Sequence, residues 1–494
     1  MLPKELQTDP ATFIQLLAQK QATIDKLTEQ WFQVQQRLDK LLHLLYGTKS
    51  EKHKSKELSV KEVVVSQKSS AKSEAEKETG SHGRHPLPLE LPRVRVEYDL
   101  IEEQQYCSCG SKMHKMGKAV SEQLDCKPVE FFVIKHIRFK YACRSCNNIV
   151  TAKLPPQPID KGLPGAGLLA EVILNKYPDA LPLYRQEQRF ARHGIDLPRS
   201  TLCDWITQST FLLEPIVQLM KTDNLLSSRR IFTDDTPVPV LAKKKTHTGR
   251  LWVYVGGGFE LPNCAIYDYT PTRSQTAPKN FLKDYRGYLQ ADAYVGYDGL
   301  YKTGDIIEVA CFAHARRKFF EVTLAAKEPS KADLALEFIG KLYEVERKAK
   351  PLTPLQRKYY RRRHSKPILD QFYQWLKKEE VTLLPKTPIG LAVAYTLNHW
   401  RALRNYCRDG ILQIDNNTAE RAIKPLVIGR KNWLFAGNHE GAKRAAVLYS
   451  IIETCKLNGI NPYFYLKDVL TKLPSTLMKD LKQLLPYHWK PTNP

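Results

Sequence analysis

Residues 229–241 read RRIFTDDTPVPVL, a run rich in β-branched residues that predicts a strand. The pattern after it predicts, in order, strands in LWVYVGGG (251–258) and NCAIYDY (263–269), a helix over 275–284, and strands over 287–292 and 305–312. Glycines separate the second and third strands, as expected of a turn between them. The region therefore predicts three strands in a meander, followed by a helix and two further strands.

This order of elements is that of an RNase H-like domain, in which the first and fourth strands lie side by side at the centre of one sheet. We expect such an α/β core over residues 227–460. Residues 313–409 have helical periodicity and are too many for one connecting loop. They predict a long helical insertion, after which the chain returns to the sheet. Residues 461–494 are expected to form a C-terminal tail segment.

Three separated acidic residues lie at or near the ends of predicted elements. Asp234 follows the start of the first strand, Asp292 ends the fourth, and Glu420 lies just inside a helix that Asp415 is placed to cap and Pro425 to end. Carboxylates gathered in this way can hold two hard divalent cations, which prefer oxygen ligands and keep positions open for phosphate. The pattern predicts a centre that cuts and joins phosphodiesters.

Three neighbouring residues leave alternatives open. Asp235 is an alternative ligand to Asp234, although neighbouring residues in a strand point to opposite faces of a sheet. Asp415 is an alternative to Glu420, although its position suits a helix cap. His314 either orients phosphate or a metal-bound water, or has a structural role.

The chain is strongly basic, with 76 Lys and Arg against 52 Asp and Glu and a formal net charge of +24. Such a charge favours a nucleic-acid partner, and a solvated basic surface is the alternative. Basic clusters flank the acidic residues at 229–230, 243–245, 361–363 and 430–431. The residues expected to touch DNA in this part of the chain are Arg316, Arg317, Lys318, Arg421, Arg430 and Lys431, and Trp433 either stacks on a base or belongs to the core.

The N-terminal part has a heptad pattern over residues 9–46. Apolar residues recur at spacings of three and four, interrupted at Lys20: Phe13, Leu17, Ile24, Leu27, Trp31, Val34, Leu38, Leu41 and Leu45. This predicts a coiled coil that pairs chains, and a helix packed on its own domain is the alternative. Residues 47–97 are mostly Lys, Ser and Glu with few aromatics, so a flexible linker is predicted.

Two cysteine pairs follow in the segment 98–158, Cys107 and Cys109 in YCSCGSKM and Cys143 and Cys146 in YACRSC. Paired thiolates separated by a strand-like stretch predict a zinc-ribbon-like module in which the metal substitutes for a core. The first pair is C-x-C, which is tighter than the usual C-x2-C, and the possible replacement ligands are His114 and Cys126. A β-module with free buried thiols is the alternative.

Residues 159–226 are predicted to be helical. The part LPLYRQEQRFARHGIDLPRSTLCDWITQS predicts a helix, a glycine-containing turn and a second helix capped by Ser200, which is the outline of a helix-turn-helix. In that arrangement Arg199 and Thr201 face DNA. A structural helical hairpin with Leu202 and Trp205 in its core is the alternative.

These motifs resemble the insertion-sequence-66 family of transposases, which are of the DDE type with an RNase H-like core. The matching motifs are DDTPVPVL from Asp234, HTGRLWVYV from His247, LQADAY around Asp292, CFAHARRKFF from Cys311, and DNNTAERAI followed by GRKNWLFAG from Asp415. The zinc-like module, the HGRHPLP stretch before it and the N-terminal heptads also match the family's layout. The resemblance therefore covers nearly the whole chain.

The resemblance implies that Asp234, Asp292 and Glu420 form a catalytic triad with two Mg²⁺ ions, or Mn²⁺ in their place. It further implies that the substrates are the element's terminal inverted repeats and target DNA, with accessory proteins of the same element as partners. A homo-oligomer is expected from the heptads and from the need to bring two ends together. The alternatives are a non-catalytic DNA-binding protein and a structure-selective nuclease.

No run of 18 or more apolar residues and no signal pattern occurs in the sequence. We therefore expect a protein of the bacterial cytosol, associated with the nucleoid and not with a membrane. Ten cysteines without a secretory signal do not predict a disulfide framework.

Overall fold

The computed structural model describes residues 20, 23, 27, 130–134, 140–142, 149–151, 156–160, 162–242, 245–258, 260–324 and 330–491. The chain divides into two compact units, one of residues 52–154 and one of residues 1–51 together with 155–494. In the first unit, strands β1 (Lys140–Ala142) and β2 (Ile149–Thr151) pair antiparallel. The four predicted zinc ligands, the linker and most of the predicted coiled coil lie outside the described residues, although residues 20, 23 and 27 are helical.

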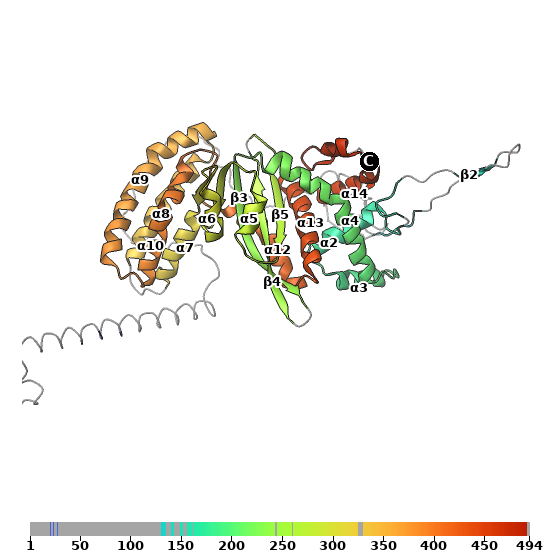
Figure 1. Ribbon diagram of the computed structural model, residues 1–494, viewed down its shortest axis with the longest axis horizontal. Coiled ribbons are helices and arrows are strands. Elements are labelled where there is room, and N and C mark those ends of the chain that lie inside the picture. Colours follow the sequence, from blue (N-terminus) through green and yellow to red (C-terminus); the bar gives the residue numbers. More distant parts are fainter. Residues whose placement is uncertain are drawn as a thin grey trace, which may run out of the picture. The chain divides into compact units, whose positions relative to one another are not determined.

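The second unit is built around one five-stranded mixed sheet in the order β5-β4-β3-β6-β7 (Figure 1). Strands β3, β4 and β5 form an antiparallel meander, and β6 and β7 then run parallel to β3. The bounds are β3 Arg230–Leu241, β4 Thr246–Gly256, β5 Cys264–Thr270, β6 Gly287–Ala291 and β7 Ile306–Ala310. The predicted meander and the two strands after it are thus present, with β3 in the centre of the sheet.

Both edges of the sheet are covered by polar groups from helices. Along β5, the Thr454 and Ser450 hydroxyls of α13 (His439–Leu457) accept from the N–H groups of Ala265 and Tyr267 at 3.0 and 2.8 Å. Along β7, the Asn405 amide donates to the Glu308 carbonyl at 2.8 Å. Because these edge groups are bonded within the chain, the two edges are poor templates for pairing with another strand.

The edge contact predicts a stability effect. Thr454→Val keeps the shape of the side chain but leaves the buried Ala265 N–H without its acceptor, which we expect to cost about 1–3 kcal/mol of unfolding free energy. Urea denaturation measures the loss. Thr471→Val is the matched control, because the exposed Thr471 hydroxyl bonds only a carbonyl of its own helix. Equal losses in the two variants would contradict the edge-covering role.

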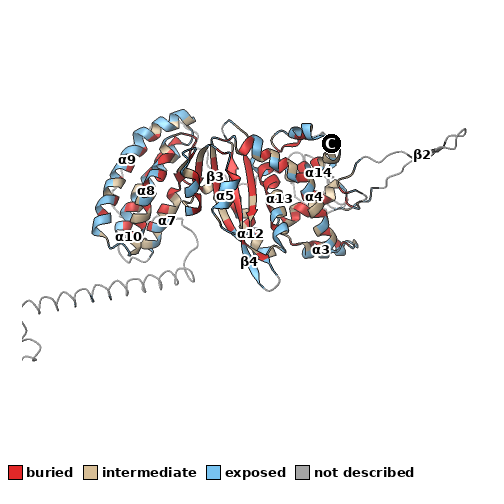
Figure 2. Cartoon of the chain, in the orientation of Figure 1, coloured by how far each residue is buried: buried red, intermediate tan, exposed pale blue. Residues whose placement is uncertain are grey.

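Helices fill the interval between β7 and the helix that carries Glu420. They are α7 Phe312–Thr323, α8 Lys331–Ala349, α9 Pro354–Thr382, α10 Pro388–Asn398 and α11 Trp400–Arg404, and α12 Asn417–Trp433 follows them. Their apolar faces share one core with β7, in which Phe312, Phe319 and Phe372 are fully buried. The outer face of α9 is exposed along its length (Figure 2). Helices α7 to α10 therefore lie beyond the β7 edge of the sheet.

A second group of helices lies beyond the β5 edge (Figure 1). It comprises α2 Ala166–Lys176, α3 Leu183–Arg192, α4 Arg199–Met220, α13, and α14 Pro462–Lys472. Helix α14 packs on α2, and its Tyr465 hydroxyl donates to the Leu484 carbonyl at 2.7 Å. The chain after residue 460 is therefore folded onto this helical group.

The remaining elements are short. They are α5 Thr276–Phe281, α6 Asp298–Tyr301, a π-helical turn at Lys221–Leu225, and 3₁₀ turns at Val295–Tyr297, Asn405–Cys407, Leu473–Ser475 and Met478–Leu484. Phe281 of α5 stacks on Tyr254 of β4, with their ring centroids 3.9 Å apart. No helix in the described part of the chain is both long and apolar enough to cross a lipid bilayer.

Two helix boundaries differ from the sequence prediction. Pro425 lies inside α12 and does not end it, because Leu426 and Ala419 of the buried face pack onto the sheet and the Tyr267 hydroxyl donates to the Ala422 carbonyl. This tertiary packing outweighs the cost of about 3 kcal/mol that an interior proline imposes.

The second difference is at the start of α4. The helix begins at Arg199 after Pro198, and the Ser200 side chain makes no capping bond. The Glu187 carboxylate of α3 accepts from the Arg199 N–H at 3.1 Å instead. A carboxylate from the neighbouring helix thus satisfies one of the first N–H groups of α4, in place of a local capping side chain.

Candidate active site

The register of the parallel strands brings Asp234 and Asp292 to the same level. Phe232 of β3 lies opposite Gln290 of β6, so each aspartate follows its paired residue by two positions. Residues two apart in a strand share a face. Asp234 and Asp292 therefore lie on the same side of the sheet, where β6 ends.

The start of α12 brings Glu420 to the same place. The buried Asn416 amide donates to the Thr233 carbonyl at 2.8 Å, which fixes the helix start one residue from Asp234. Asp415 accepts from the Asn417 N–H at 3.2 Å and from the Tyr343 hydroxyl at 3.2 Å. The N-cap residue of α12 is Asn416, whose side chain makes no capping bond, so Asp415 bonds the first helical N–H from one residue further out than predicted. Glu420 lies in the first turn of this helix.

The negative charges of Asp292 and Glu420 both act on the buried carboxyl group of Asp234. The pKa of Asp234 is raised to about 7, chiefly by burial, then by the negative charge of Asp292, with smaller contributions from Asp235 and Glu420. Among the described residues, no cationic side chain bonds Asp234, whose Oδ1 accepts from the Asp235 N–H at 2.8 Å. Oxygen donors with uncompensated negative charge are the ligand set that Mg²⁺ or Mn²⁺ prefers, so these residues fit the expected cations.

Asp235 is already neutralised by two arginines. Its carboxylate pairs with Arg250 at 3.0 Å and with Arg273 at 2.8 Å, and its side chain is 2% exposed. Arg273 in turn stacks on Tyr294, 3.9 Å from the ring centroid. A carboxylate held by two guanidinium groups is a poor ligand for a divalent cation, so the structure favours Asp234 over Asp235.

This arrangement predicts different consequences for the two adjacent aspartates. Asp235→Asn is expected to lower the unfolding free energy by about 1–2 kcal/mol, because two partly buried guanidinium groups lose their partner. The affinity for Mn²⁺, measured by titration calorimetry, is expected to stay at the wild-type value. A Mn²⁺ affinity that fell in Asp235→Asn while Asp234→Asn kept it would reverse the assignment.

His314 and Cys311 lie next to Glu420 at the start of α7. The His314 Nε2 is 4.0 Å from the Glu420 Oε1, and the Cys311 Sγ accepts from the Asn416 N–H at 3.1 Å. Burial lowers the pKa of His314 and raises that of Cys311 to about 12. Cys311 was not singled out from the sequence, although its place just before a predicted helix and three residues before His314 was visible. The thiol supports the start of α12, and the imidazole faces Glu420.

The residues predicted to touch DNA are distributed over several elements. Arg199, Arg317, Lys318, Arg421 and Lys431 are exposed, and Thr201 is half-buried. Lys318 lies over the Tyr395 ring at 4.5 Å, and Arg316 lies 5.4 Å from the Phe320 ring centroid. The Arg430 guanidinium contacts β3 through the Thr236 hydroxyl and the Pro237 carbonyl. A contact of Arg430 with the strand was not expected from the sequence.

Helices α3 and α4 have features of both alternatives, a DNA-binding helix-turn-helix and a structural helical hairpin. Gly194 adopts a φ of 71° in the turn between α3 and α4, a conformation that glycine tolerates without strain. Leu202 and Trp205 are buried, as a structural hairpin requires. Arg199 at the first position of α4 remains exposed.

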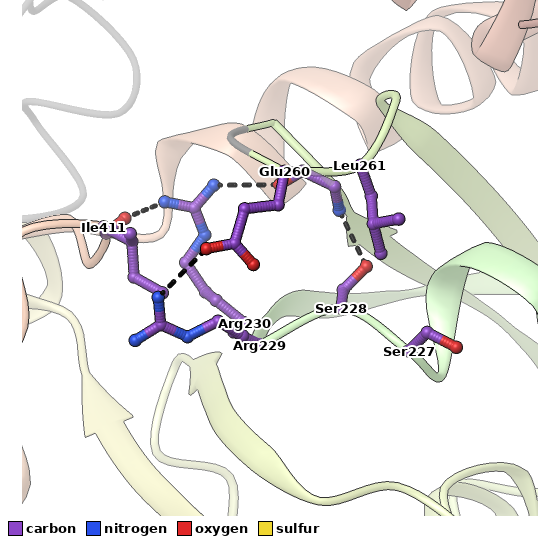
Figure 3. Close-up of a pocket in the computed structure, with 8 residues that line it drawn as sticks. Ser227, Ser228, Arg229, Arg230, Glu260, Leu261 and Ile411 are labelled. Carbon is purple, nitrogen blue, oxygen red and sulfur yellow. Dashed lines mark hydrogen bonds and ion pairs between the residues drawn. The ribbon is translucent and has the colours of Figure 1, made fainter.

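Two of the basic clusters have internal partners. A pocket at the start of β3 is lined by Ser228, Arg229, Arg230, Glu260 and Ile411, and includes none of the three carboxylates (Figure 3). Arg230 donates to the Ile411 carbonyl there. In the second cluster, Arg361 is 1% exposed. Arg230 and Arg361, from the basic clusters at 229–230 and 361–363, are therefore bonded inside the protein.

Comparisons with known proteins agree with this geometry. The profile of the "Transposase IS66 family" matches residues 161–444, and the "zinc-finger binding domain of transposase IS66" matches residues 104–147. The "IS66 C-terminal element" matches residues 450–487, and "Transposase C of IS166 homeodomain" matches residues 33–96. These matches define the chain as a transposase. It belongs to the IS66 family.

Relatives of similar length occur in Sinorhizobium fredii strain NGR234. The uncharacterized protein y4hP is 36% identical over 428 residues, which cover 82% of this chain and 77% of y4hP. The uncharacterized protein y4jD is 33% identical over 426 residues, covering 82% of this chain and 81% of y4jD. The similarity therefore extends across most of each protein.

Proposed function

We propose that this transposase cleaves the ends of its insertion sequence and joins the 3′-hydroxyl ends to target DNA at a centre made of Asp234, Asp292 and Glu420. The proposal is carried by the register that places Asp292 at the level of Asp234, together with the Asn416 bond that holds the start of α12, and so Glu420, on β3 one residue from Asp234. Electrostatics also support it, because the negative charges of Asp292 and Glu420 both contribute to the raised pKa of Asp234.

We further propose that the sheet is an RNase H-like core. The meander β3-β4-β5 followed by parallel β6 and β7, with β3 central, supports this assignment. Ligands of such sheets bind beyond the carboxyl ends of the parallel strands. Asp292 directly follows β6 at that end of the sheet. His314 is the fourth residue after the end of β7.

The chemistry assigns separate tasks to the residues. Two divalent cations, when bound, activate the attacking water or 3′-hydroxyl and stabilise the leaving oxygen. Asp234, Asp292 and Glu420 would hold these cations, with Asp234 at the centre of the set. Because Asp234 is buried, the effective dielectric constant around it is lower than in water. Its carboxylate therefore attracts a cation more strongly.

DNA contacts are proposed for the exposed basic residues around this centre. Arg317, Lys318, Arg421 and Lys431 are placed to bind the phosphate backbone, which supplies affinity with little sequence discrimination. Arg199 and Thr201 of α4, the zinc module and the N-terminal heptads are proposed to recognise the terminal repeats and to pair chains. The family profiles over residues 33–96 and 104–147 support a DNA-binding role for the N-terminal part of the chain.

The proposal is tested with purified protein, labelled terminal-repeat DNA and a target plasmid in Mg²⁺ or Mn²⁺. We expect cut ends and, in the same reaction, joined products that depend on the terminal sequence and are lost with EDTA. Joining must also disappear when the 3′-hydroxyl is replaced by a dideoxy end. Cleavage governed by DNA shape without joined products would show a structure-selective nuclease, and magnesium-independent binding without cleavage would show a non-catalytic DNA-binding protein.

A further inference from the structure

The segment that returns from the helical insertion to α12 has an unusual set of partners. This return segment, Tyr406–Leu412, contains only the end of a 3₁₀ turn, so most of its carbonyl groups have no helix or strand partner. Four arginines contact it: Arg229, Arg230, Arg357 and Arg361. We call these four residues the arginine cradle.

Arg361 is the centre of the cradle. It comes from the second turn of α9 and donates to the carbonyls of Tyr406, Asp409 and Leu412 at 2.8, 3.0 and 2.9 Å. Its Nε and Nη2 also bind the two oxygens of Glu346 at 2.8 and 2.6 Å. These contacts employ all five N–H groups of a guanidinium that is 1% exposed. Three of these five bonds hold the return segment, and the other two bind Glu346 of α8.

The other three arginines bind the segment from α9 and from the start of β3. Arg357, one turn before Arg361 on α9, donates to the Gly410 carbonyl at 3.1 Å. At the start of β3, Arg229 binds the Asp409 carboxylate at 2.7 Å. Its neighbour Arg230 donates to the Ile411 carbonyl (Figure 3). The cradle therefore ties the insertion and the central strand to the same seven residues.

Polar contacts continue from the return segment to the carboxylates. The buried Gln290 side chain of β6 donates to the Gln413 carbonyl at 2.9 Å and accepts from the Gln413 N–H at 2.9 Å. Asn416 then binds the Thr233 carbonyl beside Asp234. Residues 406–416 are thus fixed on β6 and β3 at several points, and Glu420 follows one turn later.

We infer that the arginine cradle positions Glu420 relative to Asp234 and Asp292, so that the helical insertion is a structural part of the cation site. The inference rests on the proposed role of the three carboxylates. A carboxylate must be placed to within a few tenths of an ångström to coordinate a cation, and outer groups that orient a ligand affect metal affinity. Lysine cannot replace Arg361 here, because an ammonium group has three donors and cannot match five acceptors.

The test measures Mn²⁺ affinity by calorimetry, together with thermal stability and DNA cleavage, in the full chain. Arg361→Lys is expected to weaken Mn²⁺ binding about 10-fold, as a residue that orients a metal ligand does, and to slow cleavage in parallel. Arg229→Ala is expected to give a smaller loss, and because that side chain is 53% exposed the variant keeps the fold even if Arg361→Lys does not. Two controls are expected to keep the wild-type affinity: Arg362→Lys, an exposed neighbour on α9, and Ile339→Val, which only destabilises the insertion core.

The variant Glu420→Gln distinguishes a failure of the cradle inference from a failure of the proposed function. If it weakens Mn²⁺ binding and both cradle variants do so as well, the inference is supported. If it weakens Mn²⁺ binding while Arg361→Lys and Arg229→Ala lower only the melting temperature, the cradle is a purely structural device and the inference is overturned. If Glu420→Gln binds Mn²⁺ like the wild type, Glu420 is not a ligand, and the proposed function fails whatever the cradle variants show.

Discussion

Replacing Asp234 with asparagine is expected to abolish strand cleavage and, at the same time, to stabilise the metal-free protein at pH 8. Asparagine keeps the size of the side chain but loses the charge that a cation requires. A catalytic loss of at least about 10³-fold is typical when one member of a cooperating set is removed. Gain of stability with loss of activity distinguishes a catalytic residue from one that supports the fold.

The stability gain follows from the pKa. The ordinary pKa of Asp234 is 3.8 and the folded value is about 7, so the unfolded chain releases this proton at lower pH than the folded chain. The stabilisation from the protonated side chain is complete below pH 4 and is lost as the pH rises through 7. We expect Asp234→Asn to add about 1–3 kcal/mol to the unfolding free energy at pH 8 and almost nothing at pH 4.

Urea denaturation in EDTA at both pH values measures this difference. Asp284→Asn is the control, because the Asp284 side chain is 69% exposed and lies outside the carboxylate cluster. Addition of Mn²⁺ is expected to stabilise the wild type and to leave Asp234→Asn unchanged. A loss of stability in Asp234→Asn at pH 8 would mean that the charge is compensated in the folded protein.

Replacing Phe372 with alanine is expected to cost about 3–5 kcal/mol, the usual loss when a fully buried aromatic side chain is removed. Phe372 is 0% exposed and stacks on Phe338 and Trp375, with ring centroids 5.2 and 5.9 Å apart. It also meets the edge of Trp400 at 5.7 Å. The side chain therefore connects α8, α9 and α11 in the core of the insertion.

Denaturation in urea is the measurement, and Tyr359→Ala on the same helix is the control. Tyr359 is 61% exposed, so its removal is expected to cost less than about 0.5 kcal/mol. Limited proteolysis of Phe372→Ala should begin within residues 331–404. A loss of under about 1 kcal/mol would show that these helices do not share one core.

The sequence predicted the sheet well because alternation and glycine turns are local signals. The meander, the two later strands and the position of Asp292 at the end of β6 follow from patterns of five to twelve residues. It was also predictable that Asp234 and Asp292 lie side by side, since the strand order of the expected fold makes the first and fourth strands neighbours.

Tertiary contacts were out of reach of the same reasoning. Arg361 belongs to an RRR run that resembles a DNA-binding cluster, yet it is buried because three carbonyls and Glu346 surround it. The sequence cannot show which arginine of a run points inward when the helix has mixed polarity on both faces. Pro425 was misjudged for a related reason, because the burial of α12 depends on residues of β3 and β4 that are far away in the chain.

The most direct test is transposition in cells by the wild type and by Asp234→Asn, Asp292→Asn and Glu420→Gln, supplied with the accessory proteins and matching ends of the element. Folding and DNA binding are checked in each purified variant. We predict that all three variants bind terminal DNA like the wild type and produce no transposition. Wild-type transposition in any of the three, with that variant correctly folded, would contradict the assignment of these carboxylates as one catalytic centre.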